Sequence, residues 1–206
     1  MEERFAFSRR TVCIFVILAT TLIPFLSGSS SAQPTCTMDE DVELRVSRNQ
    51  NAVLYWKETC DDGTSDVWYL ISTDKGDSWS DTQLLASFSS DRTLLDFDGI
   101  IAGRGDRLLA SFAVQEGTTA KVEVKFSRDG GTTWSEFVTA GQFEDSILTD
   151  CPTLTAEYQK KLGGFVLFTT VGDGGVDNAI YVMKSKNGRT WDVIGPVGPS
   201  DLPDCG

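Results

Sequence analysis

The sequence predicts an all-β protein built from three repeated units, and three observations support this prediction. Gly, Ser, Thr, Asp and β-branched residues are frequent, while runs that favour a helix are hard to find. A turn signal, Ser-x-Asp or Ser-x-Asn, recurs at nearly equal spacing from Ser72, Ser127 and Ser185. Short apolar runs flank each signal at similar distances. With 206 residues and 40% hydrophobic content, the chain is long and apolar enough for a sizeable core.

The first 32 residues predict a segment that is separate from this fold. An arginine-containing start is followed by an unbroken apolar run, Thr11–Leu26, and by small residues that suit cleavage ahead of Gln33. This layout is typical of a secretory signal peptide at 1–32, which leaves a domain at 33–206. The run is short for a membrane-spanning helix, which needs about 20 residues. An uncleaved N-terminal membrane anchor stays open as the alternative, and in both cases we expect the domain to be extracellular.

Each repeated unit, at about 41–88, 96–140 and 151–198, contains four short apolar runs that we expect to be strands. They are Val42–Val46, Ala52–Trp56, Val67–Ile71, Thr82–Ala86, Phe97–Ala102, Arg107–Val114, Val122–Phe126, Glu136–Ala140, Pro152–Ala156, Gly164–Val171, Ala179–Met183 and Asp192–Val197. Three units of four antiparallel strands are typical of the blades of a β-propeller. Three blades would leave sheet edges and apolar faces uncovered. We therefore expect an incomplete ring in a truncated chain, self-association that completes the propeller, or a compact variant of the fold.

The three turn signals predict hairpin turns, because each lies between the third and fourth strands of its unit. Asp and Ser side chains bond nearby backbone amides, Gly supplies a positive φ, and the Trp packs over the turn. We expect a structural role and no catalysis, since no nucleophile and base accompany the signal. The residues are Ser72, Asp74, Gly76 and Trp79; Ser127, Asp129, Gly131 and Trp134; and, one residue shorter, Ser185, Asn187 and Trp191.

These turns resemble the Asp-box (BNR) repeat, Ser-x-Asp-x-Gly-x-Thr-Trp, of the sialidase-like β-propeller family. The resemblance covers about Asp41 to Val197, and the third copy departs from it by its deletion and by Asn187. It implies propeller blades, usually six or more in a closed ring, with the boxes on the face opposite any active site. The family contains both sialidases and non-enzymatic receptors and assembly factors, so the boxes imply the fold and leave the activity open.

Four cysteines follow the apolar leader, and an even number in an exported chain predicts two disulfides. Three connectivities are open, and we favour Cys36–Cys60 and Cys151–Cys205. In each pair one cysteine precedes the first strand of a unit, and its partner lies in or just beyond that unit on the same face. A zinc site is disfavoured, because the chain has no His and no close pair of cysteines.

The net charge of −12 disfavours nucleic acid and anionic lipid as partners. Membrane contact is expected only through an uncleaved leader. Acidic residues concentrate in the loops expected opposite the turn signals, where Arg92 and, on a first strand, Arg45 are the arginine candidates. A sialidase would need three arginines around a carboxylate, a Tyr nucleophile paired with Glu, and an acid/base Asp.

The acidic loops favour a cation or a basic protein patch as ligand, and we expect no cofactor other than Ca²⁺. Simple solvation of these side chains is the alternative. The candidates are Asp61, Asp62, Asp173 and Asp177, with Asp91, Asp96, Glu116, Glu144, Asp145 and Asp150 in the same loops.

The sequence thus predicts a secreted, non-catalytic module that binds an extracellular protein or glycan. The alternative is a fragment or divergent member of a sialidase, that is, a glycoside hydrolase.

Overall fold

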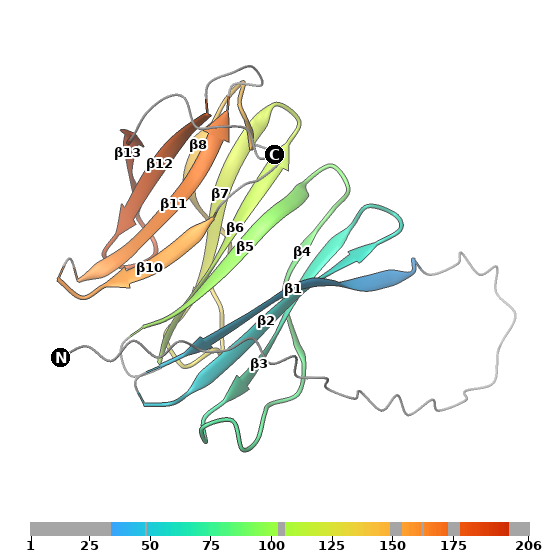
Figure 1. Ribbon diagram of the computed structural model, residues 1–206, viewed down its shortest axis with the longest axis vertical. Helices are drawn as coiled ribbons and strands as arrows, with labels where there is room; N and C mark the ends of the chain where they lie inside the picture. The colour runs from blue at the N-terminus through green and yellow to red at the C-terminus, as the bar shows by residue number, and fades with distance from the viewer. Residues whose placement is uncertain are drawn as a thin grey trace, which may run out of the picture. The chain divides into compact units, whose positions relative to one another are not determined.

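All residues that the computed structural model describes belong to one compact unit: 34–47, 49–102, 106–148, 154–161, 163–172 and 178–197. They form three antiparallel sheets with four main strands each and contain no helix (Figure 1). The predicted all-β fold is confirmed. The predicted leader, 1–32, lies outside the described ranges. Within those ranges no helix is long and apolar enough to cross a membrane.

Each sheet is a meander whose strands pair in chain order. The first contains β1 (Cys36–Val46), β2 (Ala52–Cys60), β3 (Ser65–Ser72) and β4 (Gln83–Phe88). The second contains β5 (Thr93–Ala102), β6 (Arg107–Glu116), β7 (Thr119–Ser127) and β8 (Val138–Phe143). The third contains β10 (Thr155–Gln159), β11 (Gly164–Gly172), β12 (Asn178–Ser185) and β13 (Asp192–Pro196), and the short β9 (Ile147–Leu148) pairs with the end of β11.

The second sheet lies between the other two and is buried on both faces. Leu108 and Phe112 of β6 join a core with the first sheet, while Leu109 and Ala113, which point the opposite way, join a core with the third. β6 is therefore an almost continuous run of buried residues. Stacking of consecutive four-stranded sheets is the arrangement of propeller blades. The described sheets do not close into a ring.

Strand β5 begins earlier than its sequence pattern predicts, at Thr93 instead of Phe97. The added residues pair with β6, and Leu94 is buried. Asp96 therefore lies within a strand, and the prediction that placed it in an acidic loop is wrong. The prediction failed because a carboxylate between apolar residues looks like a loop residue until its partners are known.

The second turn, Ser127–Trp134, is held by the side chains of its Ser and Asp. Gly131 N donates to Ser127 Oγ at 2.8 Å, and Thr133 N donates to Asp129 Oδ1 at 2.9 Å. Gly131 has a φ of +93°, a conformation that favours glycine. The first turn repeats these bonds, with Gly76 N on Ser72 Oγ at 2.8 Å and Ser78 N on Asp74 Oδ1 at 2.9 Å.

The third turn, Ser185–Trp191, keeps the same pattern despite its deletion. Gly188 N donates to Ser185 Oγ at 2.8 Å, and Thr190 N donates to Asn187 Oδ1 at 3.0 Å. The amide oxygen of Asn187 thus takes the acceptor position of the aspartates. Because one carbonyl-type oxygen suffices for this position, loss of the negative charge leaves the turn geometry intact.

The second turn also contacts the first sheet. The Trp134 ring meets the Tyr69 ring edge to face, with 5.6 Å between centroids, and the Tyr69 hydroxyl donates to Gly131 O at 2.9 Å. A Cβ on Gly131 would lie 2.4 Å from Ile71 Cδ1. The turn is therefore both a local hairpin and a contact between consecutive sheets.

The predicted disulfide between Cys36 and Cys60 is confirmed. The two residues face each other in the register of β1 and β2, at the end of the first sheet opposite its Ser-x-Asp turn. Cys151 and Cys205 lie outside the described residues.

Glycine-to-alanine changes in two turns separate two contributions to the free energy of unfolding: the clash with the neighbouring sheet and the cost of the left-handed backbone. Gly76 and Gly131 share a φ of +93°, but a Cβ on Gly76 would have no atom within 4 Å. Gly76→Ala should cost about 1 kcal/mol for the left-handed backbone, and Gly131→Ala about 2 kcal/mol more because of the clash with Ile71. Urea unfolding of the dilute protein measures both values, and equal losses would contradict the contact.

The turn aspartates predict an acid-sensitive stability. Hydrogen bonds from Ser78 and Ser72 lower the pKa of Asp74 to about 2, and those from Thr133 and Ser127 lower the pKa of Asp129 to about 2. A carboxyl whose folded pKa is depressed contributes stability that is present above about pH 4 and is lost as the pH falls toward about 2.

Replacing both aspartates by Asn, the residue of the third turn, should keep the turns and remove their titration. We expect the free energy of unfolding of the double variant Asp74→Asn/Asp129→Asn to fall less between about pH 4 and pH 2 than that of the unmodified chain. Urea unfolding at a series of pH values measures this, and parallel curves would show that these carboxylates are not responsible.

Candidate functional site

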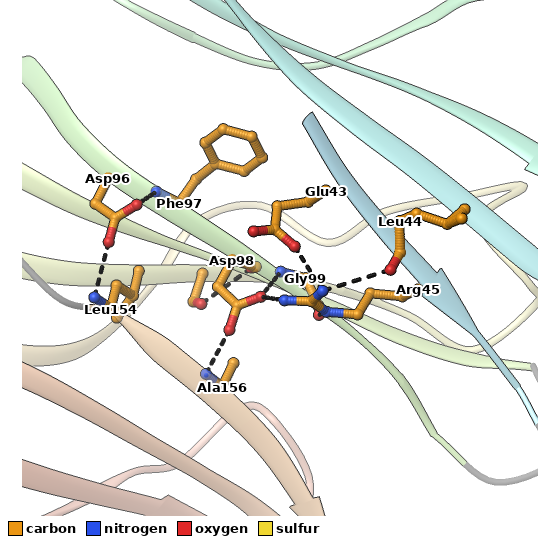
Figure 2. Close-up of polar contacts among 10 residues, drawn as sticks. Glu43, Leu44, Arg45, Asp96, Phe97, Asp98, Gly99, Leu154 and Ala156 are labelled. Carbon is orange, nitrogen blue, oxygen red and sulfur yellow. Dashed lines mark hydrogen bonds and ion pairs between the residues drawn. The ribbon is translucent and has the colours of Figure 1, made fainter. Parts of the chain in front are cut away.

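Arg45 of β1 connects the first sheet to the second. Its Nη2 forms an ion pair with Asp98 of β5, and its Nε donates to Gly99 O at 2.7 Å. Glu43 lies on its Nη1 side at 2.5 Å. Figure 2 shows the guanidinium between these two carboxylates. Arg45 is half-buried and its positive charge is already paired.

Two aspartates of β5 connect the second sheet to the third. Asp98 Oδ2 accepts a hydrogen bond from Ala156 N at 2.7 Å, and Asp96 Oδ2 accepts one from Leu154 N at 2.8 Å (Figure 2). Asp98 Oδ1 also accepts from Gly99 N at 2.7 Å. Because both oxygens of the buried Asp98 carboxylate have donors, this group positions the strands and is poorly placed to act as an acid or base.

The close packing around Asp98 depends on Gly99. A Cβ at this position would lie 2.4 Å from Cε2 of Tyr55, which is 1% exposed. Burial raises the pKa of Tyr55, so its hydroxyl stays neutral next to the Arg45 and Asp98 charges. Its oxygen has no hydrogen-bond partner among the described residues.

An open groove of about 760 Å³ lies beside this cluster. Its polar lining includes Arg45, Ser47 and Asn49 from the first sheet and Glu157, Tyr158 and Lys160 from the third. The first set lies at or near the β1–β2 turn and the second at or near the β10–β11 turn. Both turns are at the end of the sheets that also carries the Ser-x-Asp turns. The groove thus offers mixed charges, an amide and one half-buried aromatic ring, a combination that suits a polar ligand with little net charge.

The second arginine candidate, Arg92, is also engaged. It forms an ion pair with the buried Glu123, and its guanidinium lies 5.5 Å from the Phe88 ring centroid and 5.3 Å from that of Phe137. These contacts join the first and second sheets. Arg45 and Arg92 lie in separate clusters, so the structure does not bring them together around one ligand.

The acidic candidates Asp61 and Asp62 lie at the β2–β3 turn and accept hydrogen bonds there. Asp61 Oδ1 accepts from Thr35 N at 3.1 Å, and Asp62 Oδ1 accepts from both the amide and the hydroxyl of Thr64, which lowers the pKa of Asp62. Asp173 and Asp177 lie outside the described residues. Across the part of the chain that is described, no group of three or more acidic or Cys side chains could hold a metal ion.

Sequence reasoning missed Asp98 and its contacts with Arg45 and with the Ala156 amide. The available signal was the placement of Asp96 and Asp98 within an apolar run, Leu94–Ile101, because a buried carboxylate needs a partner. That signal indicates a buried polar contact but does not identify Arg45 or the β10 amides.

The fold is similar to that of a Hadza microbial sialidase, Hz136, with a TM-score of 0.61 and 14% sequence identity over 76% of this chain and 37% of that chain. A second similar structure is a mutant alpha-L-arabinofuranosidase, arb93a, from Fusarium graminearum in complex with an iminosugar inhibitor. It has a TM-score of 0.45 and 16% identity over 74% of this chain and 47% of that chain. No family model and no curated protein sequence matches the chain. The chain spans less than half the length of either structure, and the likeness extends to the fold alone.

Replacing Asp98 by Asn should destabilise the protein by about 3 kcal/mol. The amide removes the charge opposite Arg45 and turns one acceptor toward a backbone N–H as a donor. Glu43→Gln is the matched control on the same arginine, because Glu43 is 34% exposed, and it should cost no more than about 1 kcal/mol. Chemical unfolding of both variants measures the difference, and similar small losses would show that Asp98 does not connect the sheets.

Proposed function

We propose that the chain is a secreted, non-catalytic Asp-box module that binds an extracellular glycan. The observation that supports this most is the pairing of both candidate arginines with carboxylates. Arg45 is shared between Glu43 and Asp98, and Arg92 pairs with Glu123. A sialidase-type site needs guanidiniums available to the carboxylate of its substrate, and these two would have to break internal ion pairs first.

A glycan fits the groove chemistry better than a charged partner does. Sugar hydroxyls both donate and accept hydrogen bonds, and a neutral sugar tolerates the mixed charges of Glu157 and Lys160. The half-buried Tyr158 ring, held edge to face against Phe165 at 5.4 Å between centroids, offers a flat apolar surface for a sugar ring. The groove volume of about 760 Å³ lies within the range of small-ligand sites.

Secretion and membership of the Asp-box family are parts of the same proposal. The leader at 1–32 has the layout of a signal peptide, and the Cys36–Cys60 disulfide is compatible with an oxidising compartment. The three Ser-x-Asp/Asn turns support the family assignment by their shared hydrogen bonds.

A second candidate function is that of a fragment or divergent member of a sialidase-like glycoside hydrolase. It is favoured by the fold likeness to the sialidase Hz136, of which the chain covers 37%. On this alternative, residues that complete the site would lie in parts that the chain does not contribute.

Incubation with sialylated model glycosides tests the first proposal against the second. We expect the purified protein to release no sialic acid and to bind neutral oligosaccharides in a glycan-array screen. Tyr158→Ala should weaken this binding about tenfold or more, the loss expected for a stacked ring. Val193→Ala, which shortens an exposed apolar side chain outside the groove, is the control and should bind normally.

Turnover of the sialosides would move the chain into the glycosidase class. Binding that survives Tyr158→Ala would place the glycan elsewhere, and absence of any glycan binding would overturn the proposal.

A further inference from the structure

The first sheet has an uncovered apolar face, here called the first outer face. Exposed side chains on it are Val42 (48% exposed), Leu44 (51%), Val46 (58%) and Leu84 (49%). The strand register places half-buried apolar residues beside them on the same face: Leu54, Trp56, Trp68 and Leu70. An apolar face of this kind on an exported domain is typical of a contact surface.

The third sheet has the complementary uncovered face, here called the third outer face. Leu167 and Thr169 of β11 are buried toward the second sheet, so Phe168 between them points outward and is 37% exposed. The register adds Val182 and Ile194 to this face, and alternation along β12 adds Ile180 and Lys184. This face is apolar at its centre. Near its Ser-x-Asn turn it carries Lys184, with Asp192 opposite it on β13 and Glu157 on β10.

The two contacts between consecutive sheets within the chain follow one rule. The residue directly before the Ser of one turn lies against the glycine of the next turn. Ile71 lies against Gly131, whose added Cβ would be 2.4 Å away, and Phe126 lies against Gly188, whose added Cβ would be 3.4 Å away. Each sheet thus offers a side chain to the turn of the sheet that follows it.

The rule leaves one unmet position at each end of the described chain. Lys184 stands directly before Ser185, where the other units have Ile71 and Phe126, and it is exposed. A Cβ on Gly76 would have nothing within 4 Å, and Trp79 beside it is 40% exposed. Among the described residues, Lys184 of the third sheet therefore has no following turn to pack against. Gly76 of the first turn likewise has no side chain of a preceding sheet packed against it.

Lys184 and the first turn carry opposite charges. Asp77 directly follows Gly76, where the second turn has Thr132 and the third has Arg189. Asp74, on the other side of Gly76, stays ionised in its turn. The unit with a lysine in the place of Ile71 or Phe126 is the third, and the turn with an additional acidic residue is the first. Opposite charges are expected at these two places if Lys184 and the first turn belong to one contact.

We propose that these two faces bind each other between two copies of the chain. The third outer face of one copy packs on the first outer face of its partner, with Lys184 against Gly76 and next to Asp77. Because each copy has both faces, the contact repeats on the other side and the two copies close a ring. The contact buries Leu44, Trp79 and Phe168, and it goes beyond the proposed function.

The test is the mass of the protein purified from cells that express the full chain, measured by light scattering and sedimentation. We expect twice the mass of one chain at micromolar concentration. Leu44→Glu on the first outer face and Phe168→Glu on the third should each abolish the dimer. Val193→Glu is the control, since Val193 is 47% exposed but pairs with the inward-facing Met183, and it should stay dimeric.

A mixture of Leu44→Glu and Phe168→Glu proteins identifies the pairing. In a mixed pair one junction joins two unmodified faces, while the other carries both glutamates. The mixture should therefore recover dimers that neither variant forms alone, held by one junction and weaker than the unmodified dimer. A Phe168→Glu protein that stays dimeric would show that first outer faces pair with each other, and a monomeric unmodified protein would show that another segment, such as the apolar leader, covers the face. Either result overturns the proposal.

The charge match has its own test. Lys184→Asp should weaken the dimer roughly threefold, the effect of an exposed ion pair, and Lys184→Asp with Asp77→Lys should restore it. If the double variant forms a weaker dimer than Lys184→Asp alone, these two residues are not in contact.

Discussion

The structure depends on contacts between sheets that share no backbone ladder. Strands pair only within their own sheet, so consecutive sheets are held by side chains alone. Asp98 is central to this, because one carboxylate accepts from Arg45 of the first sheet and from Ala156 N of the third. A buried carboxylate is stable only with such partners. The same requirement places β1, β5 and β10, the first strands of the three sheets, side by side (Figure 1).

The Ser-x-Asp and Ser-x-Asn turns have a second role in the same arrangement. Their side chains satisfy local amides, which makes each turn a rigid surface, and their glycine and tryptophan then contact the preceding sheet. The third turn has the same hydrogen-bond geometry, although Asn187 stands where the other turns have Asp. Hydrogen-bond acceptance at this position therefore matters more than negative charge. Where no preceding sheet exists among the described residues, at Gly76 and Trp79, the same surface is uncovered.

Use of charge for internal contacts limits the chemistry of the site. Arg45 and Arg92 were the sequence-based candidates for binding an anion, and both are paired with carboxylates. Asp61 and Asp62 were candidates for a cation; Asp61 accepts a hydrogen bond from the Thr35 amide, and Asp62 accepts hydrogen bonds from Thr64 within its turn. The groove beside Arg45 is therefore lined by a mixture of polar groups and one aromatic ring.

The sequence by itself determined most of the strands and the three turns, because these follow from alternation and turn chemistry. It favoured the Cys36–Cys60 pair among three connectivities, and the register of β1 and β2 decided it. It did not determine which residues meet across the sheets. Asp96 looked like a loop carboxylate and Arg45 like a free cation, since charge pairing depends on neighbours more than fifty positions away. Only the stacking of the sheets decides that Asp98 lies between Arg45 and Ala156, and that two apolar faces are left uncovered, because packing between sheets has no periodic signature in the chain.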